Sequence, residues 1–276
     1  MKLRVVELLL VTTVPTMVLA VGGWPSIQLM AITLIGGTLA AGGANAINMY
    51  IDRDIDKLMV RTQNRPLVTG VLTPREAMIF AIVLEILAFL VLWAGANLLA
   101  AVLAVSAMLF YVFVYSLWLK RTSKQNIVIG GAAGAMPVLV GWAAVTNSLG
   151  WAPVVLFVVI FLWTPPHFWA LAIRHADDYK AAGVPMMPVV VSLERTVRSM
   201  TIYAVLLTLS TLVLVPVADL GWIYGITALV FGVAFVLGSI RLGSDPSPKR
   251  SMRLFTFSIT YVTAVFVALT VDVLMQ

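Results

Sequence analysis

The sequence predicts an all-α integral membrane protein, built as a bundle of nine transmembrane helices. Of its 276 residues, 61% are hydrophobic and only 11% are charged, whereas soluble domains average about 25% charged residues. The apolar runs are continuous rather than alternating, which indicates helices and argues against a barrel. The placement of the basic residues supports the count of nine.

Nine apolar segments have the length of about 18–25 residues that a helix needs to cross a bilayer core of ~30 Å. The predicted spans are 5–22, 27–50, 75–94, 97–117, 126–146, 152–173, 197–216, 220–240 and 252–274. The first run could pass for a signal peptide, but it contains Pro15 and lacks a clear Ala-x-Ala cleavage site, so we interpret it as a membrane helix. Thr73, Pro74 and Glu76 form a capping box that predicts the start of the third helix.

All eighteen Lys and Arg residues lie at the N-terminus or in the loops after predicted helices 2, 4, 6 and 8, loop edges included. With nine helices these segments share one side of the membrane, which the positive-inside rule makes cytoplasmic. We expect a plasma-membrane protein with its N-terminus in the cytoplasm and its C-terminus outside. The net charge of +6 then reflects orientation and anionic lipid, not nucleic acid. The residues expected to have only this orienting role are Lys2, Arg4, Lys249 and Arg250.

The chain is expected to form a single domain, residues 1–276. Small residues are concentrated at positions 36–44 and 130–135, where they would let helices pack closely. The likeness of these two stretches is consistent with a 4+4+1 helix pseudo-repeat. The absence of cysteine excludes disulfides, thiolate metal sites and cysteine nucleophiles.

A charged stretch directly follows the second helix, with three aspartates and four basic residues in positions 52–65. At 100° per residue, Asn48, Asp52 and Asp56 fall within about 80° of one helix face, whereas Asp54 points elsewhere. Two carboxylates and an amide oxygen suit Mg²⁺, which completes its shell with water and phosphate oxygens. The alternative is a solvated helix end whose acids and bases pair. The basic residues that could hold phosphates are Arg53, Lys57, Arg61 and Arg65.

A second charged cluster follows the sixth helix, where Arg174 and Asp178 stand four residues apart on one expected helix face. Both clusters lie at the cytoplasmic end of a helix, so two opposed faces would form a site for two cations that bridge a diphosphate. Because close carboxylates repel each other, such a site needs cations before it binds an anion.

Several polar or aromatic residues inside or near the spans have two interpretations. His167 is either a hydrogen-bonded packing residue or a substrate contact, and His175 is expected to meet water or phosphate. Glu85 is either a structural partner or part of a cavity wall. Tyr111 and Tyr115 either pack in the core or line an apolar tunnel.

The pattern Asn48-x-x-x-Asp52-x-x-x-Asp56 resembles the first aspartate motif of the UbiA-type intramembrane prenyltransferases. The second cluster departs from the usual Asp-x-x-x-Asp, because Arg174 stands where the first aspartate would be. This departure resembles one branch, the protohaem IX farnesyltransferases or haem O synthases. The blocks similar to that branch are Asn-Arg-Pro-Leu at 64–67, Asn-Ile-Val-Ile-Gly-Gly at 126–131, Thr-Pro-Pro-His-Phe-Trp-Ala-Leu-Ala at 164–172 and Asp-Tyr-Lys-Ala-Ala-Gly-Val-Pro-Met-Met-Pro-Val at 178–189.

The resemblance implies transfer of a farnesyl group from farnesyl diphosphate to a vinyl group of haem B, giving haem O, with Mg²⁺ assisting departure of the diphosphate. The residues expected to hold Mg²⁺ are Asp52, Asp56, Asp178 and Asn48. The expected catalytic residues are the three aspartates and Arg174. The expected substrate-binding residues are Asn48, Arg53, Arg61, Arg65, Lys120, Lys124, Tyr179, Lys180, His167 and His175.

Other functions stay open at this point. A prenyltransferase acting on a quinone precursor or a glycerol phosphate is disfavoured by Arg174 and the block around His167. A secondary transporter of an anionic substrate would place its site near the bilayer midplane, whereas these charges gather at one interface. A lipid-binding or assembly factor would leave the aspartates unexplained. The expected partners are the two substrates and membrane lipid, without nucleic acid, and the sequence predicts no oligomeric state.

Overall fold

The computed structural model describes residues 3–245 and 247–276, with side chains described from residue 11 onward except at residue 246. The predicted orienting side chains of Lys2 and Arg4 therefore lie outside the described part. Within the described ranges the chain is helical and contains no strand, so the all-α prediction is confirmed.

The long helices follow the predicted spans to within a few residues. They are α1 (Leu3–Val21), α2 (Ile27–Ile51), α5 (Pro74–Gly95), α6 (Leu98–Leu109), α8 (Asn126–Thr146), α9 (Trp151–Arg174), α12 (Leu193–Val217), α13 (Trp222–Ser244) and α14 (Pro248–Met275). The π-helix η1 (Phe110–Leu119) continues α6. The short helices are α3 (Arg53–Asp56), α4 (Pro66–Thr69), α7 (Lys120–Thr122), α10 (Ala176–Ala181) and α11 (Met187–Val190).

Eight helical stretches in the described part are long and apolar enough to cross a membrane. They are α2, α5, the continuous stretch from α6 through α7, α8, α9, α12, α13 and α14. The first predicted span corresponds to α1, whose apolar part with described side chains is the shorter Val11–Val21. The multi-pass helical bundle is thus confirmed, whereas the count of nine and the orientation of the termini stay predictions.

The start of α5 follows the predicted capping box. The Thr73 hydroxyl accepts a hydrogen bond from the Glu76 backbone N–H at 3.2 Å, and the Glu76 carboxylate accepts from the Thr73 N–H at 2.8 Å. These two bonds satisfy donors that a helix N-terminus leaves free. Pro74 occupies the first turn, where its missing N–H costs nothing.

The small residues of α8 serve close packing. A Cβ placed on Gly130 would overlap the ring of Tyr115, and one on Gly131 would lie 3.0 Å from the Thr164 side chain. Glycine at these positions therefore lets η1 and α9 approach α8 closely.

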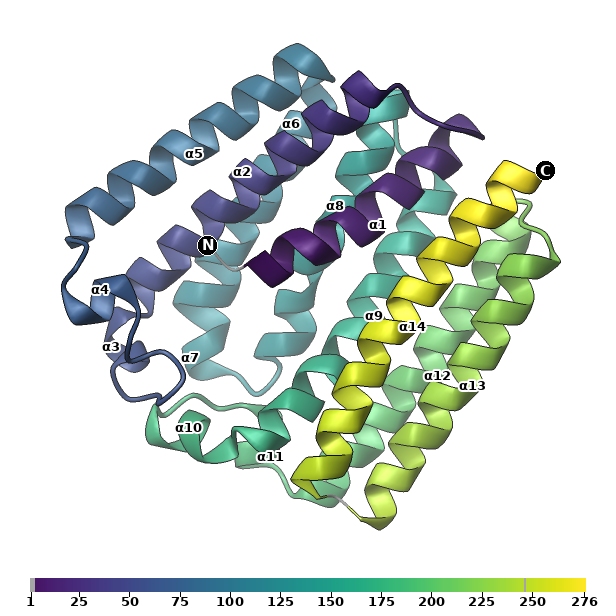
Figure 1. Ribbon diagram of the computed structural model, residues 1–276. Coiled ribbons are helices and arrows are strands. Elements are labelled where there is room, and N and C mark those ends of the chain that lie inside the picture. Colours follow the sequence, from purple (N-terminus) through teal and green to yellow (C-terminus); the bar gives the residue numbers. More distant parts are fainter. Residues whose placement is uncertain (1–2, 246) are drawn as a thin grey trace.

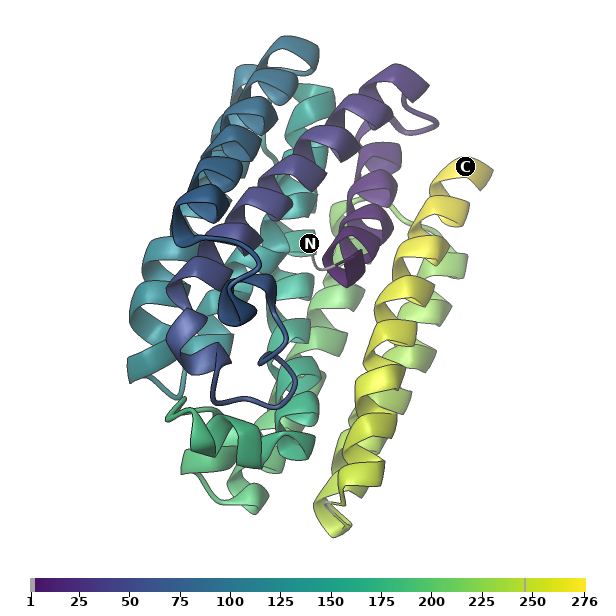
Figure 2. The ribbon, with the colours of Figure 1, turned by 60° about the vertical axis from the view of Figure 1, so that its left-hand side comes forward.

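Two groups of long helices make up the bundle (Figure 1). On one side α5, α2 and α6 pack with α8 around an alanine-rich core, and on the other α9, α12, α13 and α14 pack around large aromatic and aliphatic side chains. The short helices α3, α4, α7, α10 and α11 lie together at one end (Figures 1 and 2). The two charged stretches of the sequence belong to this end, which we call the loop end.

Candidate active site

The first cluster forms where α2 gives way to α3. The Asp52 N–H donates to the Asn48 carbonyl at 2.9 Å, and the Asp56 N–H donates to the Asp52 carbonyl at 2.8 Å. The four-residue spacing therefore persists across the junction, and Asn48, Asp52 and Asp56 are all buried, with Asp52 0% exposed. Asp54 lies on the outer side with its side chain 58% exposed, as the helical periodicity predicts.

One oxygen of Asp52 is fully engaged and the other is free. Asn48 donates from its amide nitrogen to Asp52 Oδ2 at 2.8 Å, and Lys120 forms an ion pair with the same oxygen. Asp52 Oδ1 is buried and has no hydrogen-bond partner among the described residues. Asn48 thus orients the carboxylate through its amide nitrogen, and its role as a metal ligand through the amide oxygen stays a prediction.

The π-helix η1 supports this arrangement. The Asn48 amide nitrogen also donates to the Ser116 hydroxyl at 3.0 Å, and that hydroxyl donates to the Tyr111 carbonyl five residues earlier at 2.9 Å. A π-helical segment shifts side chains relative to an α-helix and is common at functional sites. Here it places the Ser116 hydroxyl next to the Asn48 side chain and the Lys120 ammonium next to the Asp52 carboxylate.

The other two aspartates are paired with arginines. Arg65 donates to Asp56 Oδ2 at 2.5 Å, and the Thr62 hydroxyl donates to the Asp56 carbonyl at 2.9 Å, which closes the loop over the cluster. Arg121 donates twice to Asp54, each bond 2.7 Å long. These bonds hold the pKa of Asp54 at about 2.

The charged side chains of the second cluster are held by fewer and longer contacts. Helix α9 ends at Arg174, and His175 separates it from α10, so the expected uninterrupted face of Arg174 and Asp178 is broken. His175 Nδ1 lies 3.6 Å from Asp178, while Arg174 is exposed and forms no ion pair within the described ranges. Burial and the neighbouring charge of Arg61 lower the pKa of His175, while Asp178 opposes this shift.

An arginine–tyrosine contact joins the two clusters. Arg61 Nη2 donates to the Tyr179 hydroxyl at 2.9 Å, and the guanidinium lies 4.9 Å from the centre of the tyrosine ring. Burial raises the pKa of Tyr179, so the side chain stays a neutral phenol. Tyr179 also packs with Ile55, Met59 and Met186 in one apolar cluster. The folded chain thereby brings the two charged stretches side by side.

The buried carboxylates have the chemistry of a hard-cation site. In the part of the chain that the structure describes, no three Asp, Glu or His side chains are close enough to hold a metal ion by themselves. However, Asp52 Oδ1 is a buried anionic oxygen without a partner, and Mg²⁺ typically takes only one or two carboxylates and completes its shell with water and phosphate. Asp52 and Asp56 therefore fit Mg²⁺, whereas Asp178 would have to move toward them.

Three expected substrate-binding residues lie away from these contacts. Arg53 folds back, donates to the Tyr50 carbonyl at 2.7 Å and covers the Tyr50 ring at 4.5 Å. Lys180 is exposed. Lys124 lines a separate groove with residues of α11 and α12.

His167 lies in an aromatic stack inside the bundle. Its ring stacks on Trp163 at 4.1 Å and on Phe255 at 4.5 Å between centroids, and Nδ1 lies 2.6 Å from the Ser258 hydroxyl. That hydroxyl donates its own hydrogen to the Phe255 carbonyl at 2.6 Å. His167 must therefore donate from Nδ1, which leaves the Nε2 lone pair free in a neutral ring. His167 is therefore hydrogen-bonded and packed, and its contact with substrate stays a prediction.

Glu85 packs between α5 and α2. The side chain is buried, and neither carboxylate oxygen has a hydrogen-bond partner among the described residues. A Cβ on Gly43 would come within 2.6 Å of Glu85 Oε1. Because Gly43 and Asp52 are about 180° apart around α2, Glu85 lies on the far side of that helix from the first cluster.

The comparisons with known proteins show the family and the fold. Residues 9–264 match the UbiA prenyltransferase family. The chain belongs to the UbiA prenyltransferase family. It is therefore a prenyltransferase, and its relatives extend over nearly its full length.

Two of the most similar relatives are named protoheme IX farnesyltransferase. The protein from Frankia casuarinae is 54% identical over 280 residues, which cover 99% of this chain and 96% of the relative. The protein from Clavibacter michiganensis is 51% identical over 277 residues, covering 99% and 90%.

Solved structures share the fold. A structure of digeranylgeranylglyceryl phosphate synthase superposes with a TM-score of 0.80 at 19% identity, covering 100% of this chain and 99% of the other. A UbiA homologue from Archaeoglobus fulgidus, bound to GPP and Mg²⁺, has a TM-score of 0.72 at 21% identity, covering 99% and 98%.

Proposed function

We propose that the enzyme transfers a farnesyl group from farnesyl diphosphate to a vinyl group of haem B, giving haem O. The observation that carries the proposal is the buried pair Asp52 and Asp56, one with an unpartnered oxygen, surrounded by basic side chains from several elements. The names of the relatives that are about half identical support farnesyl transfer to haem. Mg²⁺ is supported by the family member solved with GPP and Mg²⁺.

The carboxylates would anchor the diphosphate through Mg²⁺. Asp52 and Asp56 would hold the cation together with Asp178, and Asn48 would keep Asp52 in place through its amide nitrogen. Mg²⁺, when bound, supplies Lewis-acid stabilisation of the departing diphosphate.

The basic residues would take up the remaining phosphate charge. Lys120 and Arg65 neutralise Asp52 and Asp56 in this structure, and we propose that they turn to the phosphates when substrate binds. Arg61, from the first charged stretch, and Arg174, from the second, would also approach the diphosphate, since a guanidinium can bind phosphate through two parallel hydrogen bonds. Charge stabilisation of this kind acts most strongly where negative charge develops during bond cleavage.

The apolar walls would protect the allylic cation that remains after diphosphate leaves. The rings of Tyr111 and Tyr115 on η1 stack on each other, with 5.3 Å between their centroids. They lie close to the first cluster, because the Ser116 hydroxyl donates to the Tyr111 carbonyl and accepts a hydrogen bond from Asn48. A wall of this kind would exclude water until the cation has bonded to the vinyl group of the acceptor. One water molecule would then add to the resulting carbocation and lose a proton, which gives the hydroxyl of the product.

The histidines are proposed to contact haem. The hydrogen-bond chain from His167 through Ser258 to the Phe255 carbonyl orients the ring and leaves Nε2 with its lone pair. Ligating histidines are typically held in this way by a partner on the other nitrogen. His175 would lie closer to the polar groups of either substrate.

The decisive experiment uses purified protein, Mg²⁺, farnesyl diphosphate and haem B, with products identified by mass spectrometry. We expect a haem that carries one hydroxyethylfarnesyl group, and none without farnesyl diphosphate. If the enzyme instead prenylates an aromatic quinone precursor and never haem, the haem assignment is wrong, while membership of the prenyltransferase family stands.

We also propose that the loop end faces the cytoplasm of a cell whose plasma membrane holds the enzyme. The support is the predicted segregation of basic residues. A cysteine introduced at Ser123, in this cysteine-free chain, should react with an impermeant thiol reagent only after the cells are opened. A cysteine at Ser148, in the loop between α8 and α9, should react from outside. The opposite pattern would reverse the proposed orientation.

A further inference from the structure

A basic groove lies at the loop end, outside the set of contacts that forms the candidate active site. It has a volume of about 390 Å³. Its walls come from three parts of the chain: the loop between α7 and α8, helix α11, and the first turns of α12. The residues that line it are Lys124, Met187, Val191, Arg195, Arg198, Ser199 and Ile202.

The cations of this groove are not neutralised by the protein. Lys124, Arg195 and Arg198 form no ion pair with any residue that the structure describes, and no acidic side chain lines the groove. In contrast, Lys120 and Arg65 in the candidate active site are each paired with an aspartate. Three like charges that converge without a counter-charge indicate an anionic ligand.

The groove changes from charged to apolar along its length. Arg195, Arg198 and Ile202 lie on successive turns of one face of α12, so the charges sit toward the loop end and Ile202 sits deeper along the membrane-spanning helix. Ile202 is 51% exposed, and the neighbouring wall includes Met187 and Val191. An amphiphile with an anionic head at the membrane surface and hydrocarbon chains below it matches this order.

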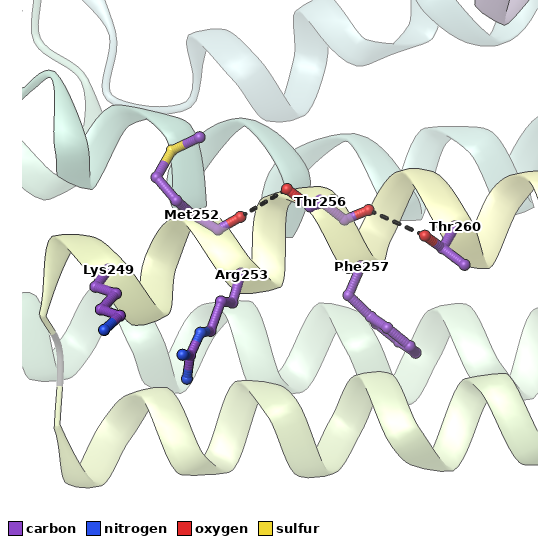
Figure 3. A pocket seen from close by; sticks show the side chains of 6 residues that line it. All are labelled: Lys249, Met252, Arg253, Thr256, Phe257 and Thr260. Carbon is purple, nitrogen blue, oxygen red and sulfur yellow. Dashed lines mark hydrogen bonds between the residues drawn. The ribbon is translucent and has the colours of Figure 1, made fainter.

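A second groove provides a contrast (Figure 3). It has a volume of about 450 Å³, and all its lining residues, including Lys249 and Arg253, belong to α14. Its two cations lie along a single helix, and the groove lacks a third cation from another element. Charge on a helix face is sufficient for diffuse attraction to an anionic membrane surface, whereas convergence from separate elements suits one defined headgroup.

We propose that the groove formed by Lys124, Arg195 and Arg198 binds the phosphate headgroup of one anionic phospholipid. The lipid would connect the α7–α8 loop, which follows the Lys120 partner of Asp52, to α11, which follows the second cluster. Lys124 lies in the loop after α7, four residues beyond Lys120, which pairs with Asp52. Met187 follows Met186, which packs with Tyr179. A bound headgroup would therefore hold the α7–α8 loop against α11 and stabilise both sides of the site.

The test is native mass spectrometry of the protein released from nanodiscs that contain phosphatidylcholine and phosphatidylglycerol. Wild type should retain one phosphatidylglycerol in preference to phosphatidylcholine. R195Q/R198Q should weaken this retention about tenfold or more, because each basic residue near an anionic surface contributes roughly one factor of five. R195K/R198K, which keeps both charges, should retain most of the binding and shows that the helix still folds.

The matched control is K249Q/R253Q, which removes the same charge from the groove of Figure 3. It should retain the lipid like wild type. Equal loss of phosphatidylglycerol in both glutamine variants would show diffuse attraction and overturn the proposal. One-for-one displacement of the lipid by haem B would also overturn it and would assign the groove to the propionates of haem.

Discussion

The two acidic clusters differ in how their charges are balanced. In the first, Asp52 and Asp56 are almost fully buried; Asp52 pairs with the distant Lys120, and Asp56 pairs with Arg65, nine residues further along the same loop. In the second, the Asp178 side chain is 17% exposed and its nearest basic partner is the local His175, at 3.6 Å. The ion pair of Asp52 therefore depends on tertiary structure, whereas the nearest basic partner of Asp178 comes from its own segment.

This difference assigns different tasks to the two clusters. A buried carboxylate is costly unless it is paired and hydrogen-bonded, so the first cluster keeps its geometry only while the surrounding elements hold their positions. The break at His175 and the exposed Arg174 give the second cluster room to adjust. We infer that the first cluster fixes where the diphosphate binds, and that the second closes on it.

The largest effect is expected from Asp52→Asn, which tests the first cluster directly. The substitution keeps the side-chain shape but removes the charge that would hold the cation, and loss of one such transition-state contact typically lowers kcat by about 10²–10³-fold. The measurement is single-turnover farnesyl transfer at saturating substrate. Unchanged thermal unfolding would show that the loss is chemical.

Asp54→Asn is the matched control, because it lies two residues away and carries the same charge. The Arg121 hydrogen bonds keep the pKa of Asp54 at about 2, so at neutral pH this substitution removes one full negative charge. Asp54 is on the exposed side, and its variant should stay within about threefold of wild type, since surface pairs contribute little. Similar losses in both variants would mean that net charge, rather than the buried position, matters.

A smaller effect on farnesyl diphosphate binding is expected from Arg174→Ala, which tests the second cluster. A hydrogen bond to a charged group contributes roughly 1.5–3 kcal/mol, so farnesyl diphosphate should bind about ten- to a hundredfold more weakly in the presence of Mg²⁺. Haem affinity, followed by absorbance, should change little. Arg174→Lys should restore only part of the binding, because lysine lacks the planar fork. Full recovery with lysine would exclude a bidentate contact.

His167→Ala is expected to show the opposite selectivity. It removes the proposed ligand nitrogen together with the stack on Trp163 and Phe255. Haem binding should therefore weaken about tenfold or more, because losses of this size are typical when a group that holds a ligating side chain is removed. Ser258→Ala removes only the partner that holds Nδ1 and should weaken haem binding less. If His167→Ala lowers only the unfolding temperature and leaves haem affinity intact, the residue is purely structural.

Helical periodicity was sufficient to predict the face of Asn48, Asp52 and Asp56 and the outward direction of Asp54, because these depend only on residues four apart along one helix. Hydropathy likewise predicted the long helices. The partners of the first cluster could not be predicted in this way. Ser116 reaches Asn48 through the π-helical geometry of η1, and a run of apolar residues contains no signal that distinguishes π- from α-helix.

The break after Arg174 was missed for a related reason. Positions 174 and 178 have helical spacing, but α9 ends at Arg174 and α10 starts at Ala176. Tyr179 accepts a hydrogen bond from Arg61 and belongs to one apolar cluster with Met59 and Met186, so packing of α10 against the first loop competes with the local spacing. The second cluster is therefore the part of the site where sequence spacing says least about geometry.

The smallest expected effect concerns the contact that joins the clusters. Tyr179→Phe keeps the ring under the Arg61 guanidinium but removes the hydroxyl that accepts its hydrogen bond. Since such a bond contributes about 0.5–1.5 kcal/mol, farnesyl diphosphate affinity should fall by roughly two- to tenfold, with kcat nearly unchanged. Tyr50→Phe is the matched control, because Arg53 also covers that ring but donates to the backbone carbonyl of Tyr50. Equilibrium titration of both variants with farnesyl diphosphate should show weaker binding for Tyr179→Phe only. An equal response would mean that the hydroxyl of Tyr179 has no special role, and that the two clusters are joined by apolar packing alone.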